Sequence, residues 1–138
     1  MILHSLMEDL KREEGFSRHC YICTEGKHTV GYGRNIDSNG GLGLSENEAE
    51  YLLQNDVQRS IDECSRGFGW FDDLDTVRQS VVVQLAFWIG YPSLSNFSRM
   101  SMAIARQDFE SAANELLDSK LATQVPGRTA RLAEQLRG

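Results

Sequence analysis

The chain has 138 residues, of which 41% are hydrophobic, and this is enough for one compact domain with a sizeable core. The formal net charge of −6 disfavours binding to a polyanion, so we expect no nucleic-acid partner. Three cysteines, an odd number, fit a reducing compartment better than a disulfide framework.

The N-terminus lacks the pattern of a signal peptide, because a charge occurs at Glu8 and charged positions then alternate with apolar ones. The longest apolar run, residues 81–89, contains Gln84 and is shorter than the roughly 20 residues that a membrane-spanning helix needs. We therefore expect a product made in the cytoplasm, without stable membrane insertion.

Two kinds of periodicity occur in the N-terminal part of the chain. Apolar residues of 2–14 recur at spacings of three and four, which predicts an amphipathic helix that stops at Gly15. Residues 17–43 alternate and are rich in glycine, which predicts a small antiparallel hairpin sheet. Ser45 and Glu48 then form a capping box for a long helix that continues to Gly67.

The C-terminal half is predicted to be helical. Asp73 is expected to cap the helix in "LDTVRQSVVVQLAFWI", which is apolar nearly all round and so belongs at the centre of a core. Gly90 and Pro92 are expected to end it, and further helices are predicted at about 95–105, at about 108–121 and from Pro126 onward. Helix, small sheet, long helix and helical bundle together make an α+β fold.

The stretch "HCYICTEGKH" contains a C-x-x-C pair between two histidines. A redox pair needs its first cysteine at a helix N-terminus, whereas Cys20 and Cys23 lie in an alternating segment. A zinc knuckle would use Cys20, Cys23 and His28, but its fourth ligand would fall on Gly33. We expect no metal and no cofactor, and we interpret Cys20 as packed behind the sheet and Cys64 as packed on the apolar face of the long helix.

Glu14 places a carboxyl group roughly 30° from the centre of the apolar stripe of the first helix, counting 100° per residue. Such a group is either a general acid beside an apolar wall or the last residue of a frayed helix end in water. Periodicity alone leaves both interpretations open.

Residues 13–34, "EEGFSRHCYICTEGKHTVGYGR", closely resemble the active-site stretch of the phage-type lysozymes of glycoside hydrolase family 24. In that family a helix ends in Glu-Gly, an Asp or Cys and then a Thr follow at fixed spacing, and Gly-x-Gly comes next. Eight residues separate Glu14 from Cys23 and five separate Cys23 from Thr29, which match the family spacings. Gly31 and Gly33 complete the motif.

The resemblance extends over nearly the whole chain, through "LSENEAEYLLQNDV", "FDDLDTVRQSVVVQLAFWIG" and "QVPGRTARL". It implies a lysozyme-like α+β fold, in which a small β-hairpin lobe is joined by a long helix to a larger all-helical lobe. We expect one domain over 1–138. Its parts are a small lobe at about 13–44, an interlobe helix at about 45–66 and a helical lobe at about 67–138 plus the N-terminal helix.

The resemblance also implies the reaction and the residues that perform it. The expected activity is that of an endolysin, a muramidase that hydrolyses the β-1,4 bond between N-acetylmuramic acid and N-acetylglucosamine in peptidoglycan. Glu14 would be the general acid, and Cys23 with Thr29 would hold the attacking water. Glu13 would be structural and would pair with Arg131.

Three further residues are candidates for binding the glycan. Glu25 either lines the cleft entrance or makes an ion pair of the strand turn. Tyr32 is a candidate for stacking on a sugar ring, although an aromatic residue of a small sheet is also a packing residue. Arg34 is a local basic group that can contact an anionic wall.

The chemistry of Cys23 stays open at the level of sequence. A thiol is mostly neutral at pH 7, and nearness to Glu14 is expected to raise its pKa further, which favours a neutral group that positions water. A thiolate would instead be a strong nucleophile and would open a covalent, retaining route.

Three rival functions also remain at this stage. They are a lytic transglycosylase acting on the same bond, a catalytically silent wall-binding module, and a zinc-knuckle binding module. For the muramidase we expect a monomer that acts on glycan strands in the periplasm or wall, after release of the holin type.

Overall fold

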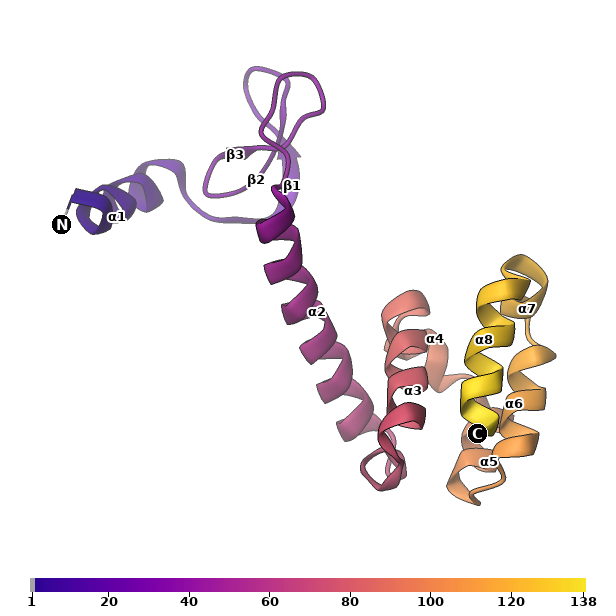
Figure 1. The fold of residues 1–138 in the computed structure, drawn as a ribbon. Helices are drawn as coiled ribbons and strands as arrows, with labels where there is room; N and C mark the ends of the chain where they lie inside the picture. The colour runs from indigo at the N-terminus through magenta and orange to yellow at the C-terminus, as the bar shows by residue number, and fades with distance from the viewer. Residues whose placement is uncertain (1) are drawn as a thin grey trace. The chain divides into compact units, whose positions relative to one another are not determined.

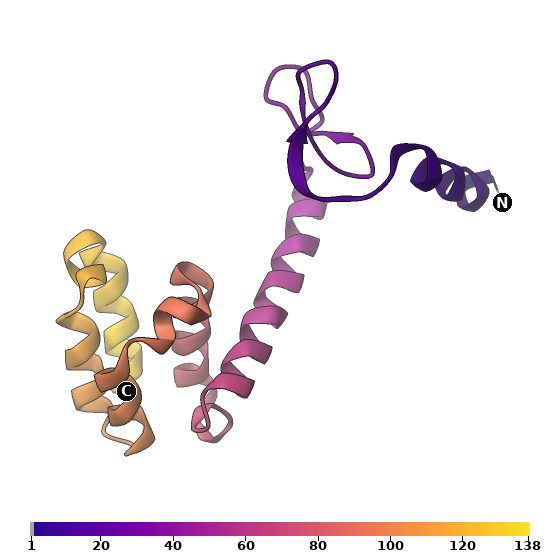
Figure 2. The same ribbon diagram turned by 180° about the vertical axis from the view of Figure 1, so that it is seen from behind.

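The computed structural model describes residues 2–138, shown from two sides in Figures 1 and 2. The chain divides into two compact units, residues 1–51 and 52–138, and the boundary falls inside the long helix α2. The elements in chain order are α1 (Ile2–Glu14), β1 (Ser17–Ile22), β2 (His28–Gly31), β3 (Arg34–Asn35), α2 (Glu46–Gly67), η1 (Phe71–Asp73), α3 (Thr76–Ile89), α4 (Tyr91–Ser95), α5 (Ser98–Ala105), α6 (Phe109–Leu117), α7 (Lys120–Gln124) and α8 (Pro126–Arg137). A mostly helical chain with one small antiparallel sheet confirms the predicted α+β fold.

The first unit contains α1 and the sheet, whose strands lie in the order β1-β2-β3 and are all antiparallel. Helix α1 ends where predicted, because Gly15 adopts a φ of +70° while its N–H still donates to the carbonyl of Lys11 at 3.0 Å. In the middle of the sheet, Thr29 pairs with Tyr21 on one side and with Asn35 on the other. The sheet therefore holds Thr29 from both neighbouring strands.

Helix α2 begins with the predicted capping box. The backbone N–H of Ser45 donates to Glu48 Oε1 at 2.7 Å, and the backbone N–H of Glu48 donates to Ser45 Oγ at 3.1 Å. The reciprocal pair satisfies two backbone donors that a helix start otherwise leaves without partners.

The second unit is built around the core that the sequence predicts. Val81, Val82, Leu85 and Ala86 of α3 are buried, and α3 packs against α8, which in turn packs against α6 and α7 (Figure 1). Cys64 of α2 is fully buried, as its place on the apolar face of that helix predicts. The four buried residues of α3 explain part of the apolar character of that helix, whereas its Val77 and Phe87 are exposed.

The cap of α3 differs from the prediction. Residues 71–73 form the short 3-10 helix η1, and the cap is Asp75, whose Oδ2 accepts the backbone N–H of Arg78 at 3.2 Å. Asp73 lies inside η1 and is exposed. The prediction was wrong by two residues, because two aspartates precede the apolar run and spacing alone does not distinguish them.

Two of the later helices are also shorter than predicted. Pro92 lies in the first turn of α4 (Tyr91–Ser95), and the predicted helix at 95–105 is observed as α5, which begins at Ser98. The predicted helix at 108–121 is split into α6 and α7. The split follows from Ser119, whose hydroxyl donates to the carbonyl of Leu116 at 2.6 Å and so ends α6.

None of the helices within residues 2–138 is both long enough and apolar enough to cross a membrane.

Candidate active site

The carboxyl group of Glu14, the last residue of α1, lies directly against the backbone of Gly33. A Cβ atom built on Gly33 would be 2.5 Å from Glu14 Oε2 and 2.9 Å from its Cδ, so no residue with a side chain fits beside this rotamer of Glu14. Gly33 also has a φ of +71°, a conformation that L side chains rarely adopt. The second glycine of the Gly-x-Gly motif therefore makes room for the carboxyl group.

Cys23 and Thr29 are joined through one carbonyl group. The Lys27 carbonyl oxygen accepts the backbone N–H of Cys23 at 2.9 Å and the hydroxyl of Thr29 at 2.9 Å. Gly26, with a φ of +77°, turns the chain between them and donates its N–H to the Cys23 carbonyl at 2.9 Å. The thiol and the hydroxyl predicted to hold water are thus linked across the turn between β1 and β2, with Cys23 directly after β1 and Thr29 within β2.

The pKa of the Cys23 thiol is held below its usual range. The main cause is hydrogen bonding from the backbone of Lys27, followed by hydrogen bonding from the backbone of Glu25. Desolvation and the negative charge of Glu25 oppose the shift without cancelling it. The direction expected from the sequence, a pKa raised by Glu14, was wrong, because the backbone of the turn dominates.

The residues predicted to bind the glycan lie in the same unit as Glu14. The Tyr32 ring packs edge-on against Phe16, with ring centroids 5.6 Å apart, and Lys11 Nζ lies 5.8 Å from its centroid. Tyr32 is half exposed, so part of its surface remains available to a ligand. Glu25 is exposed in the β1–β2 turn. Sugar contacts of Tyr32 and Glu25 stay predictions.

Arg34 is engaged within the protein. Its guanidinium holds both carboxylate oxygens of Glu48 and also donates to the carbonyl of Gly43. The predicted contact of Arg34 with the wall stays a prediction, because its guanidinium is already bound within the protein.

The structural pair predicted from the resemblance involves Glu13 and Arg131. Glu13 Oε1 lies 3.8 Å from Nε of its neighbour Arg12, and both side chains are largely exposed. Arg131 is an exposed residue of α8 in the second unit. Pairing of Glu13 with Arg131 stays a prediction, as does the assignment of lobes within 1–138.

The C-x-x-C stretch does not assemble a metal cage. Cys20 Sγ lies 3.7 Å from His28 Nδ1, but within residues 2–138 no three His, Cys, Asp or Glu side chains are grouped so that they could hold a metal ion. Cys20 is exposed rather than packed behind the sheet, so that interpretation was wrong. Cys20 belongs to β1, an edge strand of the sheet, and alternation in the sequence does not distinguish an exposed position of such a strand from a covered one.

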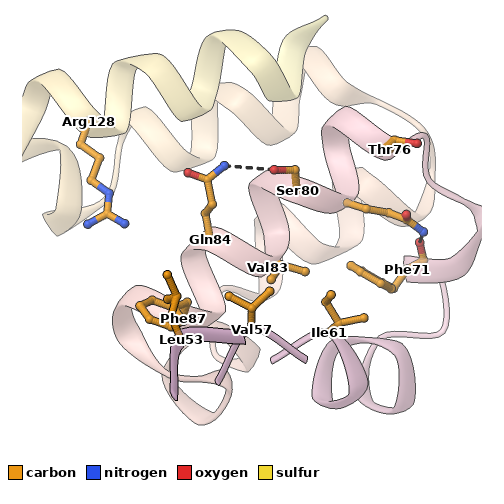
Figure 3. A pocket seen from close by; sticks show the side chains of 11 residues that line it. Leu53, Val57, Ile61, Phe71, Thr76, Ser80, Val83, Gln84, Phe87 and Arg128 are labelled. Carbon is orange, nitrogen blue, oxygen red and sulfur yellow. Dashed lines mark hydrogen bonds between the residues drawn. The ribbon is translucent and has the colours of Figure 1, made fainter. Parts of the chain in front are cut away.

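An apolar groove of about 420 Å³ lies in the second unit (Figure 3). Its walls come mainly from α2 and α3, and the lining residues are Leu53, Val57, Ile61, Phe71, Thr76, Gln79, Ser80, Val83, Gln84, Phe87 and Arg128. Arg128 is the only ionisable residue in this lining. Because its lining contains no carboxyl group, this groove provides no general acid.

Two contributors to the site were not identified from the sequence. Lys27 acts through its backbone, which leaves no signal in the type of side chain. Glu48 was identified only as half of a capping box, although the same carboxylate also holds Arg34.

The sequence of the chain matches a known protein family. The model of the phage lysozyme family matches residues 11–134. The chain is 28% identical to Probable T4-type lysozyme 2 of Dictyostelium discoideum, over 95% of this chain and 92% of that protein. It is 23% identical to Probable T4-type lysozyme 1 of the same organism, with the same coverage.

A third relative is much longer. The chain is 27% identical to the Pre-baseplate central spike protein Gp5 of Enterobacteria phage T4, over 93% of this chain but only 27% of that protein. Because the family model spans nearly the whole chain, including the Glu14, Cys23 and Thr29 motif, this protein belongs to the phage lysozyme family and is a glycoside hydrolase of the lysozyme type, which degrades peptidoglycan.

Proposed function

We propose that this lysozyme is a muramidase of the endolysin kind, which hydrolyses the β-1,4 bond between N-acetylmuramic acid and N-acetylglucosamine. The observation that carries the proposal is the carboxyl group of Glu14 against Gly33, in the same unit as the linked pair of Cys23 and Thr29. Glycoside hydrolysis needs a carboxylic acid for the leaving group and a second group that activates or replaces water.

In the first step the bond between the anomeric carbon and the glycosidic oxygen breaks. The electron pair of that bond goes to the oxygen, and Glu14 gives its proton to the same oxygen, so the leaving sugar departs as a neutral alcohol. The anomeric carbon gains the positive character of an oxocarbenium ion, and Glu14 becomes a carboxylate.

In the second step a water molecule attacks the anomeric carbon. The Thr29 hydroxyl donates its proton to the Lys27 carbonyl, so its oxygen faces the water as an acceptor. When Cys23 is deprotonated, its sulfur accepts a proton from the same water, and the lowered pKa of the thiol raises the fraction of molecules in that form. Attack from the face opposite the leaving group inverts the anomeric configuration.

The test of the proposal is clearing of permeabilised Gram-negative cells, followed as turbidity, by the wild type and by Glu14→Gln. Glu14→Gln should lose clearing by at least about 100-fold, since it removes the transferable proton and keeps the shape. Glu13→Gln is the matched neighbour and should keep clearing activity. Equal clearing by the wild type and Glu14→Gln would refute the proposal.

A second experiment addresses Cys23. Cys23→Ser should reduce lysis by about 100-fold and should still give the inverted, α-configured reducing end, because a hydroxyl still holds the water but does not take its proton. Product anomers are read by NMR during the first minutes of digestion. A β-configured product from the wild type, with no lysis by Cys23→Ser, would instead establish the covalent route.

The same pair of proteins gives a pH test. An acceptor thiolate requires that kcat rise with pH as Cys23 loses its proton, with a midpoint below the usual pKa of a cysteine. This rise should be absent from the pH profile of Cys23→Ser. A profile identical in both proteins would contradict the acceptor role.

The proposed setting of the reaction follows the family. The chain is made in the cytoplasm, reaches the glycan strands of the periplasm or wall after release of the holin type, and acts there as a monomer. Anhydro ends in the digest would point to a lytic transglycosylase instead.

A further inference from the structure

Arg34, the first residue of β3, uses three nitrogen atoms of its side chain for contacts inside the first unit. Nη1 lies 2.6 Å from Glu48 Oε2 and Nη2 lies 2.8 Å from Glu48 Oε1, which is a two-pronged, charge-assisted pair. Nε donates to the carbonyl of Gly43 at 3.0 Å. The side chains of Arg34 and Glu48 are 33% and 40% exposed, so the pair is partly shielded from water.

Glu48 is itself held in place by the start of α2. Its Oε1 accepts the backbone N–H of Ser45 at 2.7 Å, while Ser45 Oγ accepts the backbone N–H of Glu48 at 3.1 Å. Hydrogen bonding from the Ser45 backbone, followed by that from the Ser45 side chain, holds the pKa of Glu48 below its usual range, and Arg34 acts in the same direction. The partner of Arg34 is therefore a fixed carboxylate rather than a mobile surface group.

The other end of the connection is the candidate active site. Arg34 directly follows Gly33, whose backbone lies against the Glu14 carboxyl group, and it pairs with Val30 across the β2–β3 ladder. The next residue of β3 pairs with Thr29. A displacement of β3 would therefore move the backbone of Gly33, which contacts the Glu14 carboxyl group. It would also move β2, which carries Thr29.

We propose that Arg34 is a positioning residue of the lysozyme reaction, which fixes Gly33 and Thr29 by fastening β3 to the first turn of α2 through Glu48. The proposal rests on the proposed function, because it assigns Glu14 and Thr29 their roles. It differs from the sequence-based prediction that Arg34 binds the anionic wall, since the guanidinium is already used inside the protein.

The physical requirement is accuracy of placement. A displacement of about 1 Å in a catalytic group can reduce a rate by about 100-fold without affecting the binding of the rest of the substrate. The planar fork of arginine matches a carboxylate in two places, whereas lysine offers one compact charge and cannot hold both oxygens and the Gly43 carbonyl in the same geometry. Replacing Arg34 by lysine therefore tests the two-point geometry of the guanidinium, because the positive charge is kept.

We call the pair of Arg34 and Glu48 the clamp, and one variant of each residue tests it. Arg34→Lys keeps the charge and removes the fork, and Glu48→Gln removes the charge while glutamine still completes a capping box with Ser45. The control is Arg59→Gln, which breaks the exposed pair of Arg59 with Asp56, 3.2 Å apart on the same helix. All three proteins are compared with the wild type as full chains.

The measurements are kcat and KM on soluble glycan fragments, melting temperature, and amide hydrogen exchange at Gly33 and Thr29. For Arg34→Lys and Glu48→Gln we expect kcat to fall by about 10-fold to 100-fold with KM within about twofold. Amide exchange at Gly33 and Thr29 should become about tenfold faster. Arg59→Gln should match the wild type in all four measurements.

Each alternative leaves a different signature. A rise in KM at constant kcat would show that Arg34 binds the wall, and it would overturn the positioning role. A lower melting temperature with unchanged kcat would show that the clamp contributes to stability and not to catalysis, which also overturns the proposal. If the wild type does not cleave the glycan, the proposed function fails, and unchanged amide exchange would separately overturn the clamp.

Discussion

At the scale of single residues, the contact between Glu14 and Gly33 is the feature with the sharpest consequence. The carboxyl group occupies the space in which a side chain at Gly33 would begin, and Gly33 also has a positive φ. Gly31 provides a natural comparison, since its φ is +69° but a Cβ atom there would meet nothing within 4 Å. The two glycines share the backbone requirement and differ only in their contact with the acid.

Gly33→Ala and Gly31→Ala are therefore expected to separate stability from activity. Each should lower the free energy of unfolding by about 1 to 2 kcal/mol, the cost of a left-handed conformation for alanine. Only Gly33→Ala displaces the Glu14 carboxyl group, so its kcat should fall at least about tenfold below that of Gly31→Ala. Urea unfolding and glycan cleavage on the same preparations check this, and equal kcat values would contradict it.

The residue scale also shows how far the motif could be predicted. Glu14, Cys23 and Thr29 were identified by spacing, and the structure places them in one unit with Cys23 and Thr29 on one carbonyl. The direction of the Cys23 pKa could not be predicted in this way. It depends on backbone groups of the turn at Lys27 and Glu25, whose orientation is set by the path of the chain and not by residue type.

At the scale of elements, α3 has the aspartate cap that the sequence predicts, but the cap is Asp75 and not Asp73. Asp75 caps the helix through Arg78 N–H, and Arg78 Nη1 lies 3.0 Å from Asp75 Oδ1. Arg78 also donates to the carbonyls of Leu136 and Arg137 at the end of α8. The cap therefore organises a side chain that connects α3 with α8 inside the second unit.

Asp75→Ala should lower the free energy of unfolding by about 1 to 2 kcal/mol, because a cap is lost and the guanidinium of Arg78 loses a partner. Asp73→Ala is the matched control and should change it by less than about 0.5 kcal/mol, since Asp73 is exposed within η1. Chemical denaturation followed by circular dichroism measures both. A larger loss in the free energy of unfolding for Asp73→Ala than for Asp75→Ala would indicate that Asp73 is the cap.

At the scale of the whole molecule, the titrating groups predict how stability varies with pH. Four carboxylates have pKa values below the usual range. The main cause is the His28 backbone N–H for Asp37, the Ser45 backbone N–H for Glu48 and the Ser111 hydroxyl for Asp108. For Asp75, desolvation raises the pKa, but the hydrogen bonds and charge of Arg78 lower it further. Burial raises the pKa of the Cys64 thiol to about 11.

The lowered carboxyl pKa values and the raised Cys64 pKa change stability at opposite ends of the pH range. A depressed carboxyl pKa means that the unfolded chain binds protons more readily, so this part of the stability is lost as pH falls below about 4. A raised thiol pKa stabilises the fold below the usual cysteine value, and that part is lost as pH rises from about 9 to about 11. Urea unfolding across this range should show a plateau between the two losses.

Cys64→Ala is the control for the alkaline side. It should be less stable than the wild type at pH 7, because a buried side chain is lost, but its further loss between about pH 9 and 11 should be smaller. An alkaline loss of equal size in both proteins would mean that Cys64 does not contribute to it.

The sequence by itself determined the features that depend on neighbours along the chain. The helical and alternating periods, the Gly15 stop, the Ser45 and Glu48 capping box and the spacing of the Glu14 motif all follow from separations of a few residues, over which backbone geometry is regular. The apolar pattern of α3 likewise predicted the burial of Val81, Val82, Leu85 and Ala86, although Val77 and Phe87 of the same helix are exposed.

Only the tertiary structure decided which groups meet across turns and between elements. The approach of Glu14 to Gly33, the shared Lys27 carbonyl and the pairing of Arg34 with Glu48 each require a particular path of the backbone between distant positions. Spacing carries no information on that path, because a loop brings its ends together through its own turns and hydrogen bonds. For that reason the candidate residues of the reaction could be proposed from the sequence, and the contacts that hold them could not.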